Sequence, residues 1–145
     1  MAKFKYSMQN ILDIKLKLET QARNEFSIAN QKYQVEKDKL QELVLKRVEY
    51  ETILKDSLSG SLNVSEIMIT KNGIATIKSA IRSQLSNVKK AEDELEIKRN
   101  ALSELVKDRK THEKLKEKAF EEFQKELKDS ESKEIDEVVS FTYNS

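Results

Sequence analysis

The residue types that most often carry out chemistry are scarce in this chain of 145 residues, which has one histidine and no cysteine. The histidine, His112, has only ordinary helix-surface acids near it in sequence, Glu113 and Glu117. Without cysteine the chain has neither a disulfide framework nor a thiolate zinc site. No carboxylate stands at an obvious metal-ligand spacing from His112. We therefore interpret His112 as a structural residue, on a helix seam or surface, and predict no metal site.

The elements that would position these side chains are predicted by composition. The chain has two glycines and no proline, where average usage gives roughly ten and seven at this length. Proline breaks helix interiors and glycine weakens them, so the chain has few places to turn. Charged residues make up 37% of the sequence, which raises the alternative of a disordered chain. Regularly spaced Ile, Leu, Val and Phe favour a few very long helices instead, with frayed ends.

The first predicted arm covers about residues 6–57 and has a heptad pattern, in which seam residues are alternately four and three apart. Its seam comprises Ala22, Phe26, Ala29, Tyr33, Glu36, Leu40, Leu43, Arg47, Tyr50 and Leu54. Upstream, we expect Met8, Ile11 and Leu18 to continue this stripe in a slightly different phase.

The second predicted arm covers about residues 74–140 and carries a longer heptad series. Its seam comprises Ile74, Ile77, Ile81, Gln84, Val88, Ala91, Leu95, Lys98, Leu102, Leu105, Arg109, His112, Lys116, Ala119, Phe123 and Glu126. Three consecutive members, Arg109, His112 and Lys116, are polar, and we expect the register to drift at these positions.

The connection between the arms holds the one cluster of turn-forming residues. We place the tip at about residues 58–73, with Gly60 ending the first helix and Asn63 or Ser65 capping the next. A separate short helix is expected at Glu66–Lys71. Two amphipathic arms around one connection predict an all-α fold, a long antiparallel two-stranded coiled-coil hairpin, with residues 1–145 as a single domain.

The predicted arms are unequal, because 59 residues precede Gly60 and 85 follow it. Residues beyond about Gln124 should therefore have no partner arm. The last part of this overhang holds acids and then apolar residues, Val138 and Val139 among them. It is either a frayed end or a helix whose apolar side chains dock on another protein, and the residues alone leave both open.

Several classes of function are disfavoured by this architecture. Paired carboxylates perform acid–base chemistry only where burial separates their pKa values, and a two-helix hairpin has no pocket for them. The two glycines are too few for a phosphate-binding loop. The net charge is +1, with opposite charges alternating along the arms, so nucleic acid is not favoured. We predict a protein that is not an enzyme and has no cofactor.

No stretch approaches 18 consecutive apolar residues, and the start lacks the apolar region of a secretory signal. The expectation is a cytoplasmic protein without direct membrane insertion.

Three short patterns then point to a family. The chain begins F-x-Y-x-(apolar)-Q-x-(apolar)-L, from Phe4 to Leu12, and has an Arg-spacer-Glu-Tyr element, Arg47-Val-Glu49-Tyr50, near the end of the first arm. An apolar-Asp-Glu element, Ile135-Asp136-Glu137, follows a Lys/Glu-rich stretch. In these patterns, its length and its longer second arm, the chain resembles the flagellar type III export protein FliJ family. It departs from the family after Glu137, where relatives often continue with basic residues.

The resemblance implies a non-enzymatic, central-stalk-like component of the flagellar export apparatus, which promotes protein export for flagellum biogenesis and motility. Such proteins are cytoplasmic and peripheral at the cytoplasmic face of the cell membrane. The implied partners are the hexameric export ATPase (FliI), the export gate protein (FlhA) and export chaperones. The implied ATPase-binding residues are Phe4, Tyr6, Met8, Ile11, Ile135, Asp136 and Glu137. The implied gate-binding residues are Leu43, Tyr50, Ile77 and Ala80.

Two alternative functions stay open at this point. One is the homologous stalk of a non-flagellar type III secretion injectisome, which genomic neighbours would distinguish. The other is a passive coiled-coil spacer, which should leave ATPase activity unchanged.

Overall fold

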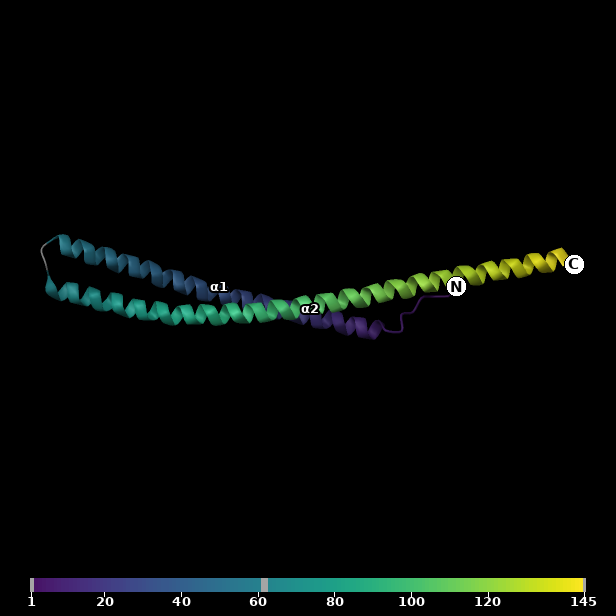
Figure 1. Cartoon of the computed structure of the whole chain (residues 1–145), viewed down its shortest axis with the longest axis horizontal. Coiled ribbons are helices and arrows are strands. Elements are labelled where there is room, and N and C mark those ends of the chain that lie inside the picture. The colour runs from purple at the N-terminus through teal and green to yellow at the C-terminus, as the bar shows by residue number, and fades with distance from the viewer. Residues whose placement is uncertain (1, 61–62, 145) are drawn as a thin grey trace. The chain divides into compact units, whose positions relative to one another are not determined.

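The computed structural model describes residues 2–60 and 63–144, and in these ranges the chain forms two helices. Helix α1 spans Gln9–Ser59 and helix α2 spans Val64–Asn144 (Figure 1). The two helices run in opposite directions and pack against each other. The predicted all-α coiled-coil hairpin is therefore confirmed.

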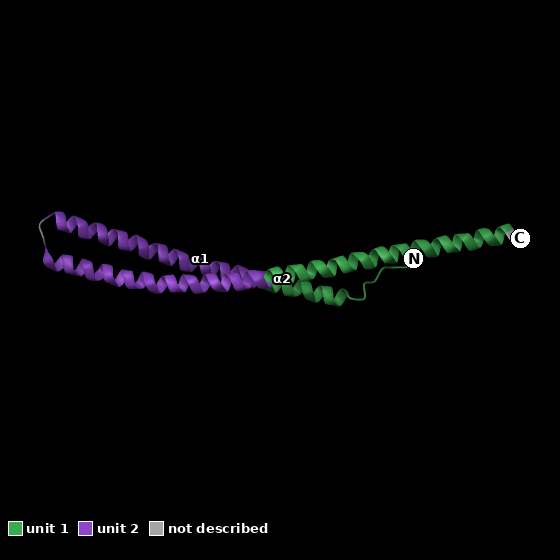
Figure 2. Ribbon diagram, viewed as in Figure 1, with its two compact units in different colours: residues 1–22, 102–145 green, residues 23–101 purple. Residues whose placement is uncertain are grey.

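The hairpin divides into two compact units (Figure 2). The hairpin unit consists of Arg23–Ala101 and contains the turn between the helices. The terminal unit consists of Met1–Ala22 and Leu102–Ser145, so it joins the start of the chain to its end. Each unit has its own seam between α1 and α2.

The seam of the hairpin unit follows the predicted heptads. Its most buried residues are Ala29, Ile74, Ile77, Gln84 and Leu95. Gln84 is polar, and its Nε2 donates to the carboxylate of Glu36 and, at 2.9 Å, to the Glu36 backbone carbonyl. Burial of apolar surface along the seam adds about 25 cal/mol per Å² to the free energy of unfolding. The hydrogen bonds of Gln84 offset the cost of burying its side-chain amide.

The seam of the terminal unit corrects one expectation. Met8, Ile11 and Leu18 are 40%, 39% and 40% exposed, so the predicted phase upstream of Ala22 is wrong. The spacing of four and three instead continues unchanged from Ala22 back to Glu19, Lys15 and Leu12. Glu19 and Leu12 are buried, and Lys15 is half-buried. Charged residues are tolerated in these two seam positions because each finds a partner of opposite charge on α2.

These partners correct the expected drift of the register as well. Arg109, His112 and Lys116 are all half-buried, at the positions that an unbroken heptad assigns to them. Arg109 forms an ion pair with Glu19 across the seam and a second with Glu113, 2.9 Å away on its own helix. The hydrogen bonds that Arg109 donates to Glu19 and to Glu113 raise the pKa of Arg109, so the guanidinium stays charged.

A second ion pair crosses the terminal unit beside the first. The Nζ atom of Lys15 lies 2.6 Å from Oδ2 of Asp108. The hydrogen bond from Lys15 lowers the pKa of Asp108, and the nearby His112 side chain adds to this effect. The polar seam positions are therefore held in register by specific charge pairing.

The tip is shorter than predicted. Helix α2 begins at Val64, ten residues before Ile74, and includes the stretch that was expected to form a separate helix. Asn63 caps it, because its Oδ1 accepts a hydrogen bond from the backbone N–H of Glu66 at 3.3 Å. Two residues of the predicted tip, Ser61 and Leu62, lie outside the described residues.

Candidate protein-binding surfaces

The described residues offer little for catalysis or metal binding. They contain no group of three or more His, Cys, Asp or Glu side chains that could hold a metal ion. His112 lies at the seam of the terminal unit, half-buried, with Nε2 3.5 Å from Oδ1 of Asp108. No helix in the described ranges is long and apolar enough to cross a membrane.

The first surface lies in the terminal unit, where the start of the chain packs on α2. The ring of Phe4 lies edge-on to Phe120, with centroids 5.1 Å apart, and its centroid is 5.4 Å from that of Phe123. Backbone hydrogen bonds from Gln9 to Tyr6 and from Ile11 to Met8 then lead the chain into α1. The segment before α1 thus covers the last apolar positions of the α2 seam.

The N-terminal residues implied in ATPase binding have different exposures. Phe4 and Tyr6 are half-buried within the terminal unit, and the Tyr6 hydroxyl is buried with no hydrogen-bond partner among the described residues. Met8 and Ile11 are exposed, because the seam takes the phase of Leu12. Only Met8 and Ile11 offer substantial free apolar surface to another protein.

The end of α2 continues beyond this packed region. Residues 124–143 are all exposed, which confirms the predicted overhang. The last seam residue, Glu126, is exposed because it faces no partner helix. Ile135, Asp136 and Glu137 lie on this overhang, and their backbone is about 18 Å beyond Phe123 at 1.5 Å per residue. The structure therefore brings Phe4 to Phe123 but not to Ile135.

The second surface lies in the hairpin unit and contains the residues implied in gate binding. Ile77 is only 8% exposed, whereas Leu43 and Ala80 are half-buried and Tyr50 is 38% exposed. Ile77 is a seam residue whose side chain supports the surface from below. Tyr50 is the most accessible of the four.

Tyr50 is positioned by a glycine on the opposite helix. A Cβ atom added to Gly73 would lie 3.3 Å from Cε2 of Tyr50, so the ring packs closely on the bare α2 backbone. This contact fixes the antiparallel register at that level. Leu43 is seven residues before Tyr50, and Ala80 is seven after Gly73, so Leu43 and Ala80 lie at one level. The four residues thus share one short stretch of the hairpin unit.

Two features of these surfaces escaped the sequence analysis. The aromatic contact of Phe4 was missed because no periodicity relates a non-helical segment to a distant helix. The pairing of Lys15 and Glu19 with α2 was missed because apolar spacing carries no signal for charged seam residues. Continuing the four-and-three spacing back from Ala22 would have placed Lys15 and Glu19 in the seam.

The sequence identifies the family to which this geometry belongs. A family profile described as "Flagellar FliJ protein" matches residues 4–145. The chain belongs to the FliJ family. The match covers both arms, the tip and the overhang, so the family assignment applies to all elements described above. No curated protein is significantly similar to the chain in sequence.

A solved structure has the same fold as this FliJ-family chain. It comes from Chlamydia trachomatis and is described as that of a candidate homolog of YscO. The two structures have a TM-score of 0.74 at 20% sequence identity, over 98% of this chain and 96% of the other. At this identity the similarity establishes a common fold.

Proposed function

We propose that this protein is a non-enzymatic, stalk-like component of the flagellar type III export apparatus, which binds the export ATPase ring and the export gate and promotes protein export. The proposal rests on membership of the FliJ family. It places the protein in the cytoplasm, peripheral at the membrane through the export apparatus, with export chaperones as further partners.

The observation that carries the ATPase contact is the exposed overhang of α2. Residues 124–143 form about 30 Å of helix at 1.5 Å per residue, with no partner helix beside them. A single helix is about 10–12 Å across, so it fits a narrow axial opening that would exclude a globular domain. Apolar side chains such as Ile135 and Val138 are exposed there and would be buried inside the ring.

The charge of the overhang indicates what its partner must present. Glu131, Glu134, Asp136 and Glu137 lie within two turns of each other and are all exposed. Their carboxylates favour basic residues in the opening of the ring, and salt should weaken such a contact because exposed charges are screened. Met8 and Ile11 supply a second, apolar contact at the mouth of the ring.

The gate contact is proposed for the stretch around Tyr50. The ring of Tyr50 is supported by Gly73 and partly exposed, so it presents an amphipathic face on a rigid backbone. Leu43 and Ala80 border it, and Ile77 acts by holding the seam closed. Loss of the ring should weaken gate binding with little loss of helicity.

Binding to the purified export ATPase of the same organism tests the proposal. We expect the full chain to co-purify with the ATPase, and the charge-reversed variant Asp136→Lys/Glu137→Lys to bind more weakly. Lys110→Glu/Lys118→Glu reverses two exposed charges away from the overhang and should bind normally. Absence of binding by the wild-type chain would contradict the proposal.

The fold shared with the YscO-related structure favours one second candidate, the stalk of a non-flagellar injectisome. The two functions differ in their cognate ATPase. Preferential binding to an injectisome ATPase over the flagellar enzyme, both taken from the same organism, would favour the second candidate.

A further inference from the structure

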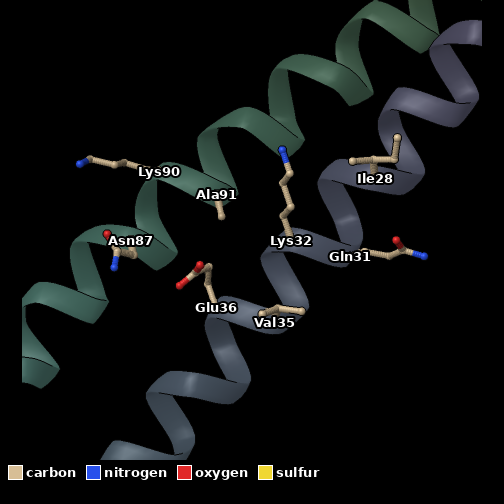
Figure 3. Close-up of a pocket in the computed structure, with 8 residues that line it drawn as sticks. All are labelled: Ile28, Gln31, Lys32, Val35, Glu36, Asn87, Lys90 and Ala91. Atoms are coloured by element: carbon tan, nitrogen blue, oxygen red, sulfur yellow. The ribbon is translucent and has the colours of Figure 1, made fainter.

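A groove runs between the helices of the hairpin unit, away from both surfaces described above. Figure 3 shows its lining, which comprises Ile28, Gln31, Lys32, Val35, Glu36, Asn87, Lys90 and Ala91. The first five residues belong to α1 and the last three to α2. None of them belongs to the proposed ATPase or gate contacts.

The groove exists because the seam is narrow at this level. Ala29 on α1 is buried and Ala91 on α2 is half-buried, at seam positions where a Leu or Ile would fill more of the space between the helices. Two methyl side chains leave the space between the helix backbones partly unfilled. The hollow is therefore fixed by residue size in two rigid helices and needs no movement to form.

The apolar wall of the groove is contributed by Ile28 and Val35. These side chains are 54% and 50% exposed, one heptad apart on the same face of α1. They lie outside the heptad seam, so they contribute little to holding the hairpin together. A docking helix whose apolar residues recur every seven positions would bury the side chains of both Ile28 and Val35. The binding free energy would gain about 25 cal/mol per Å² of apolar surface buried.

The charged lining of the groove is unbalanced. Glu36 is already engaged, by Gln84 across the seam and by Nζ of Lys39 at 3.7 Å. Lys32 and Lys90 make no ion pair within the described part of the chain. Figure 3 shows Lys32 directed toward α2, whereas the Lys90 side chain extends from α2 away from α1, at the outer edge of the groove. Two lysines against one glutamate thus give the lining a net positive charge, with one lysine inside the groove and the other at its outer edge.

From this combination we infer that the groove docks an amphipathic helix of another protein, with apolar residues along one stripe and acidic residues beside it. The apolar stripe would pack on Ile28, Val35 and Ala91. The acidic flanks would pair with Lys32 and Lys90. This contact is separate from Tyr50 and from the overhang, and it stands whether or not the proposed ATPase and gate contacts hold.

Fluorescence titration of the full chain tests the inference. Because the sequence has no cysteine, the variant Gln31→Cys carries one environment-sensitive dye in the groove. The probe is a short helical peptide with leucines at three- and four-residue spacings, flanked by glutamates. A matched peptide has lysines in place of the glutamates. We expect saturable binding of the acidic peptide, weakened by salt, and at least tenfold weaker binding of the basic one.

Two pairs of variants localise the contact. Lys32→Glu/Lys90→Glu should weaken acidic-peptide binding roughly tenfold, as the loss and reversal of two exposed ion pairs imply. Its control is Lys110→Glu/Lys118→Glu, with the same change in charge outside the groove. Ile28→Gln/Val35→Gln should weaken binding without changing helicity. Its control is Leu45→Gln/Val48→Gln, which removes two equally exposed apolar side chains elsewhere on α1.

Three results would overturn the inference. The first is equal affinity for the acidic and basic peptides, and the second is no binding of the acidic peptide. The third is equal weakening by the groove variants and their controls. A chain that self-associates in sedimentation velocity, and loses that association in Ile28→Gln/Val35→Gln, would show that a second copy occupies the groove instead.

Discussion

Glu19 of α1 and Arg109 of α2 face each other across the seam of the terminal unit and form an ion pair there. The Glu19 side chain is 6% exposed and that of Arg109 is 19% exposed, so both charges are largely withdrawn from water. Each residue stands at a position where a heptad ordinarily places an apolar side chain. The pair favours one axial alignment of the two helices, because a shift of either helix would separate the two charges that meet across the seam.

The first prediction concerns this pair. Glu19→Leu or Arg109→Leu alone should lower the thermal midpoint, because each removes the cross-seam partner of a largely buried charge. The double variant Glu19→Leu/Arg109→Leu should recover at least the wild-type midpoint, since two leucines pack well at seam positions. Circular dichroism melts of the four proteins measure this. Additive losses in the double variant would contradict the account.

The second prediction concerns the neighbouring pair of Lys15 and Asp108. Because Lys15 lowers the pKa of Asp108 in the folded chain, the pair stabilises the fold above the unfolded carboxyl pKa of about 3.9. That stability is lost as the pH falls through the lower folded pKa. Asp108→Asn should therefore melt below wild type at pH 6, and the difference should shrink below about pH 4.

A matched control for this pH series is Asp93→Asn. Asp93 pairs with Lys89 four residues away on the same helix, with both side chains well exposed. Exposed pairs of this kind contribute little to stability because water and salt screen them, so this variant should melt close to wild type throughout. A difference at pH 6 as large as that of Asp108→Asn would contradict the special role of the inter-helix pair.

The third prediction concerns Gly73 under the Tyr50 ring. Gly73→Ala adds a Cβ 3.3 Å from Tyr50 Cε2, which the partly exposed ring can accommodate by a small shift. The gain in helix propensity, about 0.5–1 kcal/mol, should then exceed the cost of shifting the Tyr50 ring. Urea denaturation should show a higher midpoint. A lower midpoint that Tyr50→Ala restores would mean that the ring is rigidly held.

The seam of the hairpin unit was predictable because its apolar residues recur at a regular spacing that only one helix face satisfies. The bounds of the tip were not predictable in this way: the tip was expected to extend to residue 73, whereas α2 begins at Val64 and continues through Gly73, which contacts Tyr50. In the terminal unit the α2 seam positions were predicted, although the expected drift of the register does not occur, and in α1 the prediction was right only for Ala22. In α1, Lys15 and Glu19 occupy seam positions through partners on α2 that the local sequence does not reveal.

The candidate surfaces were predictable to different degrees. The overhang follows from the unequal lengths of the two arms, so arithmetic on the sequence was sufficient to find it. The groove beside Ala91 depends on which seam residues face each other across the hairpin. That pairing follows from the register of the two helices, which the sequence patterns of the separate arms do not specify.

The fourth prediction concerns the segment before α1. Phe4→Ala removes two aromatic contacts, each worth about 0.5–1.5 kcal/mol. The segment should detach while the helices persist, so hydrogen exchange should accelerate at the backbone N–H groups of Gln9 and Ile11. Phe141→Ala removes a ring on the exposed overhang and should leave hydrogen exchange at Gln9 and Ile11 unchanged. Unaltered exchange in Phe4→Ala would show that the backbone turn holds the segment alone.

The central claim is that the overhang of α2 acts on the export ATPase, and truncation after Phe123 tests it most directly. The deletion removes residues 124–145; of these, 124–143 are exposed in the structure, so the hairpin should keep its helicity per residue and thermal midpoint. The measurement is the ATP hydrolysis rate of the cognate export ATPase with the full chain, with the truncated chain and alone. The account predicts stimulation by the full chain and none by the truncated one. Full stimulation by the folded, truncated chain would contradict it and assign the contact to the remainder of the hairpin.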